Sequence, residues 1–156
     1  CWDTHLTKIK GRNVLFIVNA SNRYTIAMTD IEPRNWNYYT MYIRSVIHGV
    51  MQEMGYSEVQ IGQYFKMSGD TTVTKTHGRK SVGGINRMVM DAQYFGKKLE
   101  KEAKYQWELS EYLNRYICQP EGFDAYGYPS ELFKLDMERL GIISKRKPAK
   151  IIDFTK

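Results

Sequence analysis

The continuous apolar run Val14–Val18 is the feature that most limits what this chain can fold into. The run is rich in β-branched residues and far too short to cross a membrane, which predicts a buried strand. Turn-forming residues stand on either side of it, at Lys10–Asn13 and Ser21–Arg23. Trp2–Ile9 before the run and Tyr24–Thr29 after it predict two more strands. Together these residues predict a three-stranded antiparallel meander.

The pattern changes to helical spacing after residue 30. Apolar residues in Trp36–Met54 recur every three or four positions, which predicts an amphipathic helix. The same spacing, or a capping serine, predicts further helices over Ser57–Phe65, Gly84–Phe95, Lys97–Ile117 and Ser130–Leu140. Strands followed by helices indicate an α+β fold. We therefore expect a small antiparallel sheet packed against several helices, with a helical C-terminal extension.

The remaining stretches complete the expected organisation. Thr71–Lys75 is expected to add a short strand to the sheet, and His77–Ser81 to form a loop. Ile151–Phe154 is expected to pair as an edge strand. Residues 1–95 are predicted to form an α+β core domain. Residues 96–156 are predicted to be a helical extension with a basic tail, packed on the same domain.

Composition narrows the classes of protein. Hydrophobic residues make up 42% and charged residues 26% of the 156 residues, as in folded globular proteins. The net charge of +6 favours anionic partners such as nucleic acid. No signal peptide or membrane-spanning run is visible, so a cytoplasmic protein without membrane contact is expected. The acids are scattered, and Cys1 and Cys118 match no metal spacing, so no metal or cofactor is expected.

The segment Lys75–Arg87 is the candidate functional segment, because it is basic, rich in glycine and free of acids. It runs into a predicted helix, whose N-terminal N–H groups suit a phosphate or carboxylate. The expected anion-binding residues are Lys75, Thr76, Arg79, Lys80, Ser81, Gly84, Asn86 and Arg87. The segment matches neither G-x-x-x-x-G-K-[ST] nor G-x-G-x-x-G. The alternative interpretation is an exposed loop in which Ser81 caps the following helix.

These features favour a non-catalytic protein that binds nucleic acid, or a complex that contains it, through Lys75–Arg87. One alternative is a small ribonuclease or nucleotide-processing enzyme that uses His5 and His77 as general acid and base. This mechanism requires the two histidines to meet in space. A second alternative is a protein–protein interaction module, in which exposed tyrosines and the helices after residue 96 contact the partner.

The sequence also resembles a family of uncharacterised bacterial, plasmid and phage proteins, at Trp2, at Val14–Asn19 and in the late basic segment. Members combine an early Trp-His/Asp element, an apolar strand that ends in Asn, and a segment like K-T-x-x-R-x-S-x-x-G-x-x-N. The matching residues of that segment are Lys75, Thr76, Arg79 or Lys80, Ser81, Gly84 and Asn86. The resemblance covers about residues 1–95.

The resemblance implies a domain of unknown function and no particular activity. Its plasmid and phage setting implies an accessory role, such as counter-defence. This chain departs from the pattern at two places. Asp3 follows Trp2, with His5 two positions further on, and Arg87 stands where the family often has an acid. Both departures argue against carrying a catalytic role over to this chain.

Overall fold

The structure is a computed structural model that describes residues 1–31, 36–75 and 78–144. In chain order its elements are β1 (Trp2–Ile9), β2 (Arg12–Asn19), β3 (Thr25–Thr29), α1 (Trp36–Glu53), α2 (Glu58–Ser68), α3 (Arg79–Gln93), α4 (Trp107–Asn114) and α5 (Pro129–Arg139). The strands form one antiparallel sheet in the order β1-β2-β3. The α+β fold predicted from the sequence is therefore confirmed.

The central strand β2 is buried on both faces, as its apolar run predicts. Phe16 lies between His5 of β1 and Ala27 of β3 in the register. Side chains alternate along a strand, so Leu15 and Ile17 face one side of the sheet and Phe16 faces the other. All three are at most 2% exposed. A sheet buried in this way needs a layer of helices on each face.

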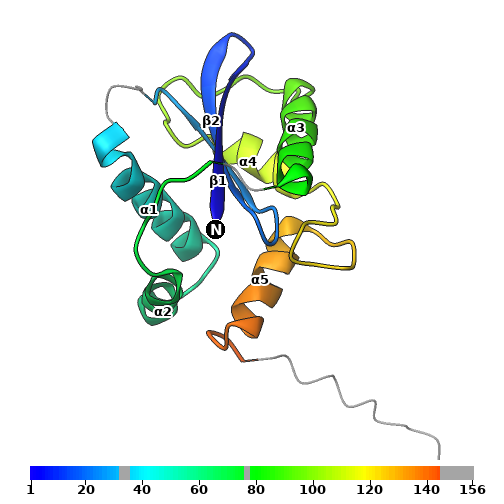
Figure 1. The fold of residues 1–156 in the computed structure, drawn as a ribbon. Helices are drawn as coiled ribbons and strands as arrows, with labels where there is room; N and C mark the ends of the chain where they lie inside the picture. The colour runs from blue at the N-terminus through cyan, green and yellow to red at the C-terminus, as the bar shows by residue number, and fades with distance from the viewer. Residues whose placement is uncertain (32–35, 76–77, 145–156) are drawn as a thin grey trace, which may run out of the picture.

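Helices supply both layers (Figure 1). Side chains of α1, α2 and α5 pack on the face that carries Leu15 and Ile17. Side chains of α3 and α4 pack on the opposite face, around Phe16. The chain between α2 and α3 must therefore pass from one face to the other, and it does so beside the first residues of β1. Thr71–Lys75 lies in this crossing and is exposed, so the short strand predicted there is wrong.

The free edge of β3 is closed partly by an antiparallel backbone bridge between Met28 and Tyr105 and partly by side chains of α4. Thr25 donates its N–H to Asn114 Oδ1 at 2.8 Å, and Asn114 Nδ2 donates to the Thr25 carbonyl at 2.8 Å. The Ala27 N–H donates to Ser110 Oγ at 2.9 Å. Ser110 and Asn114 are one helical turn apart on α4, so they share a face. α4 thus lies along the edge and satisfies the backbone groups of Thr25 and the N–H of Ala27, while the backbone before α4 bonds Ala27 and Thr29.

The long helix predicted over Lys97–Ile117 is wrong, since α4 covers Trp107–Asn114 alone. Gln106 accounts for the difference. Its side-chain amide donates to the carbonyls of Glu100 and Ala103 at 2.9 and 2.6 Å and accepts from the Glu100 N–H at 2.8 Å. These bonds hold the preceding residues in a loop. The interleaved charges and apolar spacing of the segment are typical of a helix, but this buried amide competes with helical hydrogen bonding.

Helix α3 begins earlier than the sequence predicts. The predicted helix Gly84–Phe95 is found, but Arg79 is its first residue, so the loop predicted over His77–Ser81 is wrong at its last three residues. Gly78, with a φ of +65°, precedes the helix. Ser81 therefore does not cap it, as the alternative interpretation of the segment required.

The remaining predicted helices are confirmed with small shifts at their ends. Ser57 caps α2 through a reciprocal capping box with Gln60. Helix α5 has a proline in its first turn and follows Tyr128, rather than a capping Ser130. The predicted edge strand at Ile151–Phe154 lies outside the described residues. No helix in the described ranges is both long enough and apolar enough to cross a membrane.

Candidate functional site

Helix α3 is fixed to the start of β1 by a polar contact. The hydroxyl of Ser81 donates a short hydrogen bond to Oδ2 of Asp3. Asp3 is only 4% exposed, on the sheet face that α3 covers. Ile85, one turn further along α3, packs into the apolar cluster beneath. The predicted anion-binding residue Ser81 therefore anchors the helix, and its hydroxyl is already used within the fold.

The turn between β2 and β3 lies next to α3 and is held by asparagine side chains. Asn19 Oδ1 accepts from the N–H groups of Ser21 and Asn22 at 3.0 and 3.2 Å. Asn22 Oδ1 accepts from the Tyr24 N–H at 2.9 Å. These bonds place Arg23 in the left-handed region, with a φ of +61°. A residue other than glycine is uncommon there, so the turn imposes this conformation on Arg23.

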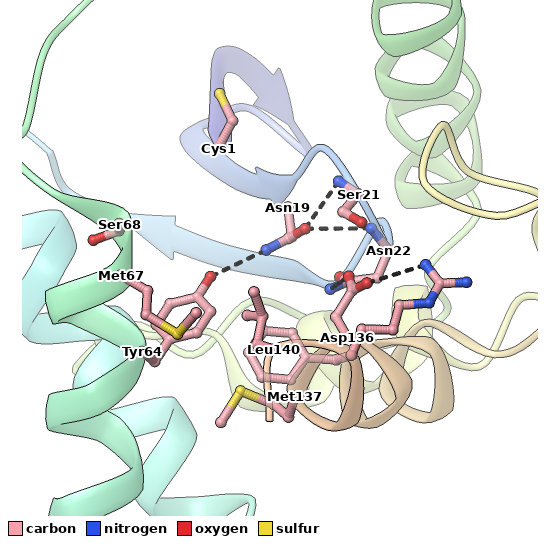
Figure 2. A pocket seen from close by; sticks show the side chains of 12 residues that line it. Cys1, Asn19, Ser21, Asn22, Tyr64, Met67, Ser68, Asp136, Met137 and Leu140 are labelled. Carbon is pink, nitrogen blue, oxygen red and sulfur yellow. Dashed lines mark hydrogen bonds and ion pairs between the residues drawn. The ribbon is translucent and has the colours of Figure 1, made fainter. Parts of the chain in front are cut away.

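The same turn is also tied to α2 and α5, as Figure 2 shows. Asn19 Nδ2 donates to Tyr64 Oη at 3.4 Å, and Asn22 Nδ2 donates to Asp136 Oδ2 at 2.8 Å. These residues line a mainly apolar cavity of about 380 Å³ on that side of the turn. Asn19 is 4% exposed and Asn22 is 1% exposed. The turn is thus a fixed support for the side chain of Arg23.

The guanidinium of Arg23 lies directly against the backbone of α3 at Gly84. A Cβ atom at position 84 would stand 2.1 Å from Arg23 Cζ, so only glycine leaves room for this contact. Glycine inside a helix is less stable than alanine by about 1 kcal/mol. Glycine at position 84 therefore allows the close contact with Arg23, although it lowers the stability of α3. This assigns a physical role to a residue that the sequence singled out for ligand binding.

Arg23 and the three cations of the first two-thirds of α3 are here called the α3 surface: Arg23, Arg79, Lys80 and Arg87. Arg23 and Lys80 line one small hollow, and Arg23 and Arg87 line another. Arg87 pairs with Asp91 at 3.2 Å. Among the described residues, no carboxylate lies within ion-pair distance of Arg23, Arg79 or Lys80. Glu121 is the acid that lines the hollow beside Lys80.

The other predicted residues are distributed around this surface. Lys75 is exposed at the end of the crossing between α2 and α3, and Asn86 is exposed on α3. Thr76 and His77 lie outside the described residues. His5 is half-buried on β1, two residues from Asp3. The expected meeting of His5 with His77 therefore stays a prediction.

Sequence reasoning missed Arg23 and Asp3. Both act through partners about sixty or more positions away in the chain, and no local pattern predicts such a contact. The one available signal was the turn composition around Asn19 and Asn22, which is typical of side chains that bond their own backbone. That composition predicted the turn but not the position of Arg23 against α3.

Cys118 provides a direct check on the position of Arg23. Burial raises the pKa of the Cys118 thiol, and the charge of Arg23 partly opposes that rise. In a Cys1→Ser background, Arg23→Gln should therefore raise this pKa further and leave less thiolate at any given pH. We expect alkylation of Cys118 by iodoacetamide to slow by roughly threefold near neutral pH, because a smaller fraction of the thiol is ionised.

The measurement is the alkylation rate as a function of pH, read by mass spectrometry of the peptide that contains Cys118. Lys134→Gln removes a charge from an exposed position on α5 and should leave the profile unchanged. A profile that does not move with Arg23→Gln, or that moves to lower pH, would show that the guanidinium does not act on this thiol.

The fold and the α3 surface define a small α+β domain with a basic face. A family model described as "Domain of unknown function (DUF6933)" matches residues 1–132, and the chain belongs to this family. The expected membership of an uncharacterised family is thereby confirmed. The match extends beyond the resemblance over residues 1–95 and includes α4. No curated protein and no solved structure matches the chain.

Proposed function

We propose that this protein binds nucleic acid, or a complex that contains it, through the α3 surface and without catalysing a reaction. The observation that carries the proposal is that Arg23 shares a hollow with Lys80, the chain neighbour of Arg79, and that none of the three has a carboxylate partner among the described residues. Placing like charges together is unfavourable unless an anion offsets their repulsion. A phosphate backbone is an anion that carries several charges and can offset several neighbouring cations.

The chemistry of the surface supports phosphate as the group that is recognised. The guanidiniums of Arg23 and Arg79 can each offer two parallel N–H donors to a phosphate. Lys80, next to Arg79 in the chain, supplies a compact positive charge. Helix α3 carries no acid of its own in its first turn, and the carboxylate that contacts this turn, that of Asp3, is buried against Ser81. The net charge of +6 adds a long-range attraction to polyanions.

The wider role in a phage or plasmid, including counter-defence, rests on the motif resemblance alone. The α3 surface adds no argument for it. The expected ligand chemistry does not depend on that role, because contacts to phosphates contribute affinity that is independent of the nucleotide sequence.

Removing two cations from the α3 surface tests the proposal. We expect the double variant Arg79→Gln/Lys80→Gln to bind a labelled single-stranded oligonucleotide about tenfold more weakly in low salt. The slope of log affinity against log salt should also become shallower by about one to two units, since fewer counterions are released. The measurement is fluorescence anisotropy at about 50 and 200 mM salt.

The matched control is Lys66→Gln/Lys134→Gln, which removes the same charge from exposed positions on α2 and α5. It should change the affinity little. Equal weakening by both double variants, salt-insensitive binding, or no binding in low salt would each refute the proposal. Cleavage of the oligonucleotide that disappears in His77→Ala would favour the ribonuclease alternative. Co-purification of a stoichiometric protein without nucleic acid would favour the interaction module.

A further inference from the structure

A small cavity of about 110 Å³ lies beside the α3 surface, between α3 and the end of α4. Its apolar wall includes Met88, Leu113 and Ile117, and Tyr116 stands at its side. Its polar side chains are those of Arg23, Thr25, Arg87, Asp91 and Cys118, and Pro129 completes the lining. The cavity is well below the roughly 300–1,000 Å³ of sites for drug-sized ligands. It suits a single planar ring rather than a whole cofactor.

We infer, on the basis of the proposed function, that this cavity receives one unpaired base of a single-stranded nucleic acid. An apolar wall next to an aromatic ring offers a base the stacking surface that proteins use for single strands. Tyr116 is 42% exposed, so part of its ring is available to a ligand. A base held there would leave water while its phosphates stay at the surface.

The polar groups fit the edge of a base. Asp91 pairs with Arg87 through Oδ1 at 3.2 Å, and its side chain is 17% exposed. The other carboxylate oxygen, Oδ2, is an acceptor for a ring or exocyclic N–H of a base. Arg87 Nε makes the ion pair, so the two terminal nitrogens of its guanidinium still have hydrogens to donate. The cavity thus presents a donor and an acceptor side by side.

Arg23 connects the cavity to the cations that would hold the backbone. Its side chain lines this cavity and also the hollow that contains Lys80. A strand that crosses α3 near Gly84 would therefore meet Arg23 between a phosphate and the base attached to it. A paired base is stacked within a duplex and cannot enter a side cavity unless it is extruded. The arrangement consequently selects single strands over duplexes.

Cys118 lines the cavity, so the reactivity of its thiol reports whether the cavity is occupied. In a Cys1→Ser background, we expect a saturating single-stranded 12-mer to slow alkylation of Cys118 by at least about fivefold. A duplex of the same sequence and a single strand of the same length that lacks its bases should bind in low salt through their phosphates. Neither should protect the thiol, because neither presents a free base.

A second measurement uses the aromatic ring. Tyr116→Ala should weaken binding of the base-bearing strand about tenfold, a typical loss when one stacking ring is removed. It should leave binding of the strand without bases unchanged. The matched control is Tyr38→Ala, at an exposed position on α1, which packs on the opposite face of the sheet from the cavity. It should change neither affinity.

The outcomes separate this inference from the proposed function. Protection by the single strand alone supports both. Binding without protection, or equal protection by the duplex or by the strand without bases, overturns the base cavity and leaves nucleic-acid binding in place. Equal weakening of both strands by Tyr116→Ala also overturns it. No binding of any oligonucleotide in low salt refutes the proposed function, and the inference with it.

Discussion

Replacing Phe133 by alanine is expected to lower the free energy of unfolding by about 3–5 kcal/mol. The side chain is 1% exposed, and its ring centroid lies 5.5–6.2 Å from those of Trp2, Tyr24, Tyr56 and Tyr64. These rings come from β1, from the turn before β3, from α2 and from the residues before α2. Truncation would remove contacts to all of them and leave a cavity that rigid neighbours cannot fill.

Chemical denaturation monitored by circular dichroism measures this loss. Leu135→Ala, on the same helix but 43% exposed, is the control and should change stability by no more than about 0.5 kcal/mol. The comparison also tests the predicted division at residue 96. If α5 were a dispensable extension, Phe133→Ala would cost as little as the control, and residues 1–95 would unfold with unchanged stability.

The second large effect is expected at Asn114, whose replacement by leucine should cost about 2–4 kcal/mol. The side chain is 8% exposed and makes two hydrogen bonds of 2.8 Å with the backbone of Thr25. Leucine would fill a similar volume but leave the N–H and C=O of Thr25 without partners. A buried polar group that loses its partner costs about 1–3 kcal/mol.

Hydrogen exchange distinguishes this mechanism from a general loss of packing. The amide of Thr25 should lose protection in Asn114→Leu by more than the amides of β2, which keep their strand partners. Arg115→Leu, the neighbouring position with 76% of its side chain exposed, is the control and should be close to neutral. Equal exchange at Thr25 in the two variants would show that Asn114 does not seal the edge.

These two residues illustrate what the sequence could and could not predict. The strands were predictable because the burial of β2 on both faces leaves a local signature in its continuous apolar run. Helices α1 and α3 were predictable because each repeats its apolar residues at helical spacing, and α2 was predictable from its capping serine, Ser57. The role of Asn114 was not predictable. A polar residue in a predicted helix is expected to face solvent. The hydrogen-bond partner of Asn114, Thr25, lies on β3, far away in the sequence.

The candidate site follows the same division. The basic character of α3 was visible in the sequence, because Arg79, Lys80 and Arg87 lie within one short segment. The completion of the α3 surface by Arg23 was not, since a long-range contact made possible by Gly84 brings it there. The predicted role of Ser81 was also limited by a long-range partner. Its hydroxyl is bonded to Asp3, which no pattern in the segment indicates.

The contact between Arg23 and Gly84 has a consequence for attempts to engineer this protein. Arg23 occupies a backbone conformation that glycine adopts more readily, and Gly84 occupies a helical position that alanine would stabilise. A screen for thermal stability alone would therefore be expected to select Arg23→Gly and Gly84→Ala. The first change removes the cation, and the second displaces it. A variant selected in this way would gain free energy of unfolding and lose the surface that we assign to its ligand.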